Sequence, residues 1–288
     1  MSLPRRTAVL AFALAACASE PTTFAPPRDA SVDIASDVAA DAPLVSADVT
    51  PRDTPPADGT SSTDDVLVYA HTSSELFRVD PRALSIRSVG RFAFAEDGQN
   101  HEMTDIAVNA AGELWGLTFD AIYRIDAMTA RCTLVSPLEG QYNGLTFVPA
   151  GVLNPSAEVL VAVERGGAYF VVNTRDGRVQ RLGAYGVGGS SGDLVSIATA
   201  DTWAIVKIAG VDNLARVDLR RGVTTVVGPT GVDDLWGLGY WRQRLYGFAS
   251  TGEFVTIDPA TGRATVVMRT SQAWWGAGVT TLAPTAPP

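Results

Sequence analysis

The sequence predicts an all-β protein, a single five-bladed β-propeller closed by pairing of the C-terminal strand with the first blade. The main observation is a five-residue phrase that occurs five times: an apolar or aromatic pair, an alternating residue, a β-branched residue, and then Asp or Asn. Successive copies end 46, 47, 45 and 40 residues apart, the period of a four-stranded propeller blade. A second observation is that the chain has one strand too few at its start and one too many at its end. The five copies end at Asp80, Asp126, Asn173, Asp218 and Asp258.

Each phrase is interpreted as the third strand of a blade, followed by a turn and a fourth alternating strand. The turn is explicit from Asp258 to Gly262, because an Asp side chain bonds backbone amides ahead of it and Gly adopts positive φ without steric cost. The five recurring Asp and Asn residues are therefore interpreted as turn formers rather than calcium ligands. Fourth strands are expected at 85–89, 131–135, 178–182, 223–227 and 264–268, and second strands at 66–70, 114–118, 159–163, 203–207 and 245–249.

The inner strands decide how the ring closes. They are expected to begin near Ile106, Leu145, Ile197 and Leu238. Nothing before Val66 has a strand pattern, whereas residues 277–282 form a spare strand. We expect this segment to become the inner strand of the first blade, which would join the two ends of the domain and remove an exposed sheet edge.

The start of the chain has the pattern of an export signal. Arg5 and Arg6 precede an apolar run of nine residues that is too short to span a bilayer. Leu14-Ala15-Ala16-Cys17 resembles the lipobox of bacterial lipoproteins. That resemblance implies that residues 1–16 are a signal peptide, that Cys17 is lipidated, and that the mature protein is anchored in a membrane. The absence of Asp after Cys17 favours the outer over the inner membrane, and the arginine pair leaves both the general and the twin-arginine export routes open.

Composition divides the remainder into a tether and one domain. Residues 18–65 are rich in Ala, Pro, Ser, Thr and Asp and hold ten acidic and two basic residues, a balance of −8, so we expect a disordered acidic tether. Residues 66–288 hold 21 acidic and 18 basic residues, a balance of −3, and suit one all-β domain that we expect to be monomeric. A nearly balanced domain argues against nucleic-acid binding by charge.

Three other features have simple structural interpretations. Cys132 lies in an alternating segment and is expected to be a small buried residue, without a disulfide because Cys17 carries lipid. His71 follows a second strand and is expected in a loop. The segment from Gly186 to Gly192, GVGGSSG, lacks the Lys and the helix of a phosphate-binding loop and is interpreted as a flexible loop between blades.

Short motifs relate the blades to known repeats. Gly112 to Gly116 reads GELWG, Leu245 to Gly247 reads LYG, and Ile257 to Gly262 reads IDPATG. These steps resemble the repeats of quinoprotein-like and gluconolactonase-like bacterial propellers over most of residues 66–285. The resemblance implies the fold, while blades of this kind serve many functions.

Candidate ligand-binding residues lie in the loops that lead from a fourth strand to the next inner strand, because these loops gather at one mouth of the channel. In one interpretation their carboxylates and amides bond a polar ligand while aromatic faces stack on it, as suits a sugar or a cationic group. In the other, the acids cap turns and the aromatics pack between blades. The candidates are Glu102, Asp105, Tyr142, Asn143, Asp193, Asp234, Trp236, Trp274 and Trp275.

An enzyme would need a nucleophile, a base or a metal cluster, and no serine motif, histidine cluster or zinc spacing is present. The gluconolactonase-like resemblance implies a divalent metal such as calcium, held in the channel by Glu, Asn and Asp. Glu102, Asn143 and Asp193 could supply the same types of ligand. Likeness to five-bladed glycosidases would instead use Asp105, Asp193 and Asp234 as an acid trio. We therefore expect a membrane-anchored binding or scaffolding lipoprotein of the bacterial envelope, without a cofactor, whose ligand is a polysaccharide or an envelope protein. A metal-dependent lactonase or glycoside hydrolase with its site in the channel is the alternative.

Overall fold

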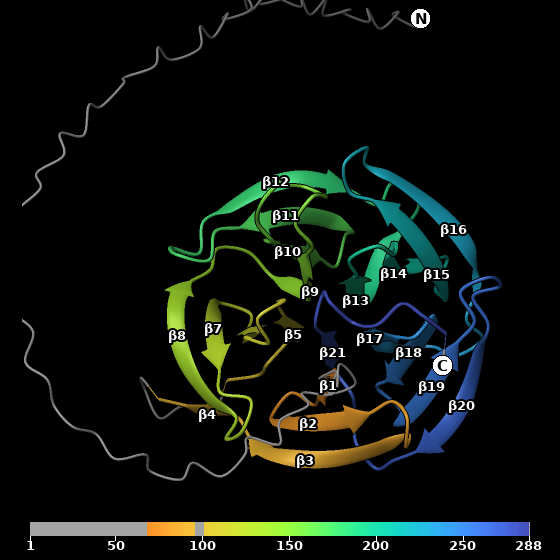
Figure 1. Ribbon diagram of the computed structural model, residues 1–288, viewed down its shortest axis with the longest axis horizontal. Helices are drawn as coiled ribbons and strands as arrows, with labels where there is room; N and C mark the ends of the chain where they lie inside the picture. The colour runs from red at the N-terminus through yellow and green to blue at the C-terminus, as the bar shows by residue number, and fades with distance from the viewer. Residues whose placement is uncertain (1–67, 96–100, 288) are drawn as a thin grey trace, which may run out of the picture. The chain divides into compact units, whose positions relative to one another are not determined.

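The computed structural model describes residues 68–95 and 101–287, and in this part of the chain it contains β-strands and no α-helix. Five sheets surround a central axis as the blades of a propeller, with one strand of each sheet innermost (Figure 1). The predicted signal peptide, Cys17 and the tether lie outside the described residues. No helix among the residues described is long and apolar enough to span a membrane.

Each blade is an antiparallel meander from an inner to an outer strand, because short turns link successive alternating segments. The first blade contains β21 (Gly276–Val279), β1 (Val68–His71), β2 (Glu75–Asp80) and β3 (Ser85–Arg91). The second contains β5 (Asp105–Val108), β6 (Leu114–Leu117), β7 (Ala121–Ile125) and β8 (Arg131–Pro137), and the third β9 (Tyr142–Val148), β10 (Val159–Glu164), β11 (Ala168–Val172) and β12 (Val179–Ala184). The fourth contains β13 (Gly189–Ser196), β14 (Thr202–Ile208), β15 (Val211–Asp218) and β16 (Val223–Pro229), and the fifth β17 (Leu235–Trp241), β18 (Arg244–Ala249), β19 (Glu253–Ile257) and β20 (Ala264–Arg269).

The predicted closure is confirmed. β21 pairs antiparallel with β1, and the register joins Val68 to Val279 and His71 to Gly276. Strands from opposite ends of the described chain therefore lie side by side in one sheet (Figure 1). This pairing covers the edge that β1 would otherwise expose.

The recurring Asp and Asn residues are turn formers, as predicted. The Oδ1 of Asp80 accepts from the amides of Arg82 and Ala83, at 2.8 and 3.1 Å. Because each bond is made to an amide two or three residues ahead, the side chain holds the tight turn between a third and a fourth strand. The same Oδ1 acceptor is found at Asp126, Asn173, Asp218 and Asp258.

Three local predictions are wrong. His71 is the last residue of β1 and is fully buried, because its pairing with β21 extends the strand by one residue beyond the expected end. The inner strand of the fourth blade begins at Gly189, not near Ile197, so half of the expected GVGGSSG loop is strand. The pattern also gave no sign of β4 (Ala93–Phe94), which pairs parallel with β8 outside the second blade.

Apolar side chains fill the spaces between neighbouring blades. Trp274 is fully buried and meets the rings of Phe77 and Phe248, with centroids 5.1 and 5.6 Å away, so it joins the first blade to the fifth. Cys132 is fully buried in β8, as predicted, and its thiol lies 3.6 Å from the carbonyl oxygen of Ala130. The blades are therefore held by inter-blade packing, which leaves the inner strands to shape the channel.

Candidate functional site

The five inner strands converge on the axis with one edge unpaired, so their amides on that edge need partners that no sixth strand supplies. Two fully buried carboxyl groups, Asp105 and Asp193, which we call the axial pair, fill this space. Asp105 accepts from the amides of Ile106 and Leu145, at 2.9 and 2.6 Å. The axial pair therefore joins strands of different blades.

Asp193 repeats this arrangement on the other side of the axis. It accepts from the amides of Leu194 and Leu238, at 2.6 and 2.8 Å, and the amide of Ala277 also donates to it. Together the two carboxyl groups receive one amide from each of the five inner strands. The axial pair acts as a plug that ties all five blades together.

The residues at the matching position of the other inner strands are glycines: Gly144, Gly237 and Gly276. Gly276 has the clearest spatial reason, since a methyl group there would overlap the Asp105 carboxyl and the His71 ring. Two Asp and three Gly thus share one layer of the channel, and at Gly144 and Gly237 a methyl group would overlap the backbone of a neighbouring inner strand.

Burial sets the protonation of this layer. It raises the pKa of Asp105 well above its ordinary value, and the nearby charge of Asp193 raises it further. Burial also raises the pKa of Asp193, against the lowering effect of its amide donors. The two carboxyl groups are hydrogen-bonded to each other, so we interpret them as sharing a proton.

His71 completes the buried polar layer. Its Nε2 lies 3.6 Å from Oδ1 of Asp105, and its Nδ1 lies 2.9 Å from the carbonyl oxygen of Thr72. Burial lowers the pKa of His71 to about 4, so the ring is neutral at pH 7. A neutral His71 contributes stability above pH 6.5 that is lost as the pH falls towards 4, whereas the protonated axial pair contributes stability at low pH that is lost as the pH rises.

A pocket of about 370 Å³, the mouth pocket, opens where the inner strands begin. Its floor is formed by the residues that immediately precede the axial layer in each inner strand: Thr104, Asn143, Gly192, Trp236 and Trp275. The axial layer therefore lies directly beneath the floor along the strands. The walls add Phe119, Arg165, Ser190, Ser191, Lys207 and Asp234.

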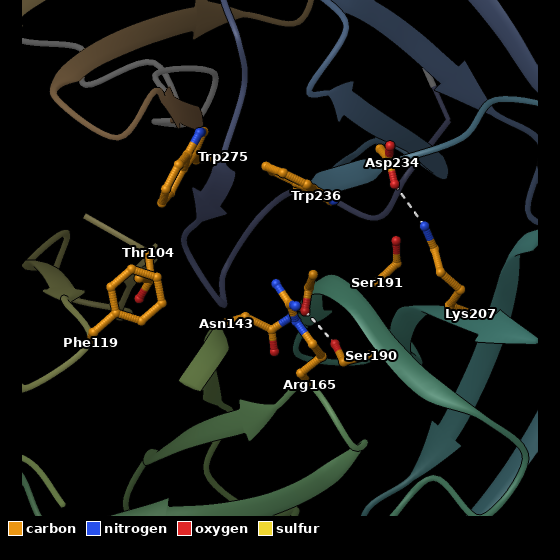
Figure 2. A pocket seen from close by; sticks show the side chains of 11 residues that line it. Thr104, Phe119, Asn143, Arg165, Ser190, Ser191, Lys207, Asp234, Trp236 and Trp275 are labelled. Atoms are coloured by element: carbon orange, nitrogen blue, oxygen red, sulfur yellow. Dashed lines mark hydrogen bonds and ion pairs between the residues drawn. The ribbon is translucent and has the colours of Figure 1, made fainter. Parts of the chain in front are cut away.

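The mouth pocket has an aromatic side and a charged side (Figure 2). Trp236 and Trp275 meet edge to face, with centroids 6.0 Å apart and planes at 87°, and Phe119 lies on the same side in this view. Across the pocket, Lys207 Nζ lies 2.7 Å from Oδ1 of Asp234 and 3.3 Å from Oδ1 of Asp212. Such an arrangement offers ring faces for stacking and polar groups for directed hydrogen bonds.

The predicted site residues separate into three groups. Asn143, Asp234, Trp236 and Trp275 line the mouth pocket together. Asp105 and Asp193 lie in the buried layer beneath it, while Tyr142 and Trp274 are buried in the packing between blades. Glu102 is exposed and does not line the pocket.

Sequence reasoning missed Phe119, Arg165 and Lys207, which lie in or next to the hairpins between second and third strands. In an antiparallel meander these hairpins reach the same end of the blade as the loops entering the inner strands. Strand direction alone would have identified them. The recurring step of Asp or Gly before Ile, Leu or Ala at 105, 144, 193, 237 and 276 would also have revealed the axial layer.

The metal set implied by resemblance does not come together. Glu102 is exposed, whereas both carboxylate oxygens of Asp193 already accept amide hydrogens. Within residues 68–95 and 101–287, no group of three His, Cys, Asp or Glu side chains is placed to hold a metal ion.

Fold and site together define a five-bladed β-propeller with a ligand-sized pocket at one mouth of a plugged channel. No protein-family model matches the sequence, and no curated protein matches it. Among solved structures, the chain is similar to one in a crystal structure of a nidogen/laminin complex, with 9% identity over 74% of this chain and 97% of that one, at a TM-score of 0.48. It is also similar to a protein of unknown function from Bacteroides caccae, with 10% identity, coverage of 71% and 72%, and a TM-score of 0.41. At such identities the likeness concerns the fold alone.

The crowding at Gly276 gives a prediction for stability. Gly276→Ala should lower the free energy of unfolding by about 2 to 3 kcal/mol, because the new methyl group overlaps the Asp105 carboxyl and the His71 ring. Gly239→Ala on β17 is the matched control, since a methyl group there lies an ordinary 3.5 Å from Val68, and its effect should stay within about 1 kcal/mol. Urea unfolding of the two variants measures the difference, and equal stabilities would contradict this description of the axial layer.

Proposed function

We propose that the protein is a lipid-anchored binding protein of the bacterial envelope, and that its propeller binds a glycan in the mouth pocket. The observation that carries this proposal is the pairing of exposed aromatic faces with polar groups in one pocket. Trp236 and Trp275 are half-buried, and their rings line the pocket with their planes at 87° to each other. Sugars present an apolar ring face and a rim of hydroxyl groups, which suits stacking on Trp combined with directed hydrogen bonds.

Asn143 adds a group that a ligand could satisfy. Its Oδ1 is covered from solvent and accepts no hydrogen bond within the described residues. Such groups are uncommon in folded proteins, because an unpaired buried acceptor costs about 1 to 3 kcal/mol. Rotation of this amide towards a sugar hydroxyl would remove that cost, so ligand binding offers a physical reason for its presence in the pocket floor.

The buried carboxyl groups favour binding over hydrolysis. A glycosidase needs two carboxyl groups that face the scissile bond. Asp105 and Asp193 are fully buried and hold the amides of the inner strands, and Asp234 is paired with Lys207. These engagements support a role in which the acidic residues build the scaffold and the aromatic residues contact the ligand.

The proposed lipid anchor rests on the pattern of residues that ends at Cys17. The lipobox-like Leu14 to Cys17 supports lipidation of Cys17 and an envelope location, with the outer membrane favoured. Several acyl chains on one cysteine hold a protein at a membrane far more firmly than a single chain, at about 0.8 kcal/mol per buried CH₂. The acidic tether of residues 18–65 would then leave the propeller free to reach glycans near the membrane surface.

Glycan binding predicts a strong effect at Trp236. The mature protein in detergent should bind to at least one member of a panel of immobilised bacterial envelope polysaccharides. Trp236→Ala should weaken that binding at least about tenfold, because one stacking face is lost. Met128→Ala, which changes an 80% exposed apolar side chain outside the pocket, serves as the control and should bind like the wild type. Binding that survives Trp236→Ala unchanged would refute the assigned site, and no binding to any polysaccharide would refute glycan recognition.

Membrane anchoring predicts that Cys17→Ser moves the protein out of the membrane fraction. The wild-type protein should incorporate a labelled fatty acid and sediment with the membranes, because its mature N-terminus is acylated. The variant should incorporate no label and should no longer depend on detergent for extraction. Equal labelling of both proteins would contradict lipidation at this residue.

A further inference from the structure

The two basic side chains that line the mouth pocket differ in their ion-pair partners. Lys207 Nζ lies 2.7 Å from Asp234 and 3.3 Å from Asp212, so two carboxylates already face this ammonium group. Arg165 lines the same pocket and forms no ion pair with any residue that the structure describes. Arg165 is therefore the charged side chain of the pocket that has no ion-pair partner among the described residues.

The backbone holds Arg165 in place at this mouth. It lies in the turn between β10 and β11, which is closed by a 2.8 Å bond from the amide of Gly167 to the carbonyl oxygen of Glu164. The amide of Ser190, at the start of β13, donates to the carbonyl oxygen of Arg165 at 3.0 Å. The third and fourth blades thus fix the backbone of Arg165, while its side chain is exposed.

On the basis of the proposed function, we infer that the glycan is acidic: an anionic oxygen group of the sugar, carboxylate or sulfate, pairs with Arg165 while the sugar ring stacks on the aromatic side of the pocket. Figure 2 places Arg165 beside Asn143 and Ser190, with the Trp rings on one side and the Lys207–Asp234 pair on the other. A ligand in the pocket can therefore reach both the rings and the guanidinium group.

The guanidinium group is suited to this role by its shape. It presents a planar fork of N–H donors that matches the two oxygens of a carboxylate or sulfate, and it stays charged at all physiological pH values. A cationic ligand would be repelled by Arg165, and the carboxylates of Asp212 and Asp234 are already held by Lys207 at 3.3 and 2.7 Å. A neutral sugar would leave the guanidinium group without a partner.

The test compares ligands that differ only in charge. Mature protein in detergent is titrated with oligogalacturonate and with its methyl ester, and with a sulfated oligosaccharide and its unsulfated parent. We expect the acidic member of at least one pair to bind at least about fivefold more tightly than its neutral partner at low salt, with a smaller preference at high salt. The pair that shows the preference distinguishes carboxylate from sulfate.

Two matched variants assign the preference to one side chain. Arg165→Gln should abolish the preference for the acidic member and leave binding of the neutral member unchanged, because the stacking face at Trp236 remains. Arg175→Gln, in the exposed turn between β11 and β12 of the same blade and outside the pocket, should retain the full preference.

The outcomes separate the two levels of the proposal. Equal binding of acidic and neutral members by the wild type, or a preference that survives Arg165→Gln, overturns the acidic-ligand inference and leaves glycan binding at Trp236 intact. Equal weakening of both members by Arg165→Gln also overturns it, since the arginine would then act on the shape of the pocket. Absence of binding by all four probes overturns the inference, and absence across the polysaccharide panel overturns the proposed function itself.

Discussion

The structure depends on how the amides at the centre of the ring are satisfied. Five inner strands leave one edge each towards the axis, and a buried amide without a partner costs about 1 to 3 kcal/mol. Asp105 and Asp193 meet this requirement together, since their carboxyl oxygens accept amides from all five inner strands. Glycine at position 276 leaves the space that the Asp105 carboxyl occupies. Inter-blade packing and strand closure hold the ring, and the axial pair joins its centre.

The same arrangement shapes the candidate site. The axial layer lies one residue beneath the floor of the mouth pocket along the strands, so the floor residues are positioned by the strands that the axial pair ties together. Trp236 and Trp275 directly precede Gly237 and Gly276, so the aromatic side of the pocket is coupled through the backbone to the buried layer. Asp105 and Asp193, which the sequence suggests as ligands, thus belong to the scaffold, whereas Asn143, Asp234 and the aromatic residues line the pocket.

The period of the phrase predicted the blade count, the chemistry of residues such as Asp258 predicted the turns, and the spare strand at the C-terminus predicted the closure. These features depend on local spacing and turn chemistry, which a single sequence displays directly. The part of β13 from Gly189 to Gly192 could not be recognised, because its Gly and Ser residues look like a loop and are ordered by pairing with β14 and by the carbonyl oxygen of Arg165. His71 was misplaced for the same reason, since its partner Gly276 is about 200 residues away in the chain. Arg165 and Lys207 were not predicted, because the prediction covered the loops that enter the inner strands and not the hairpins between second and third strands.

The proton shared by the axial pair provides the most direct test of this account. An Asp whose pKa is raised by folding stabilises the protein at low pH and loses that contribution as the pH rises above about 4. Asp105→Asn supplies a neutral donor to Asp193 and removes the need for the proton. The free energy of unfolding, measured by urea titration from pH 4.5 to 7.5, should therefore fall with pH more steeply for the wild type than for the variant, by up to about 1.4 kcal/mol per pH unit. Parallel profiles over this range would contradict a shared proton at the axis.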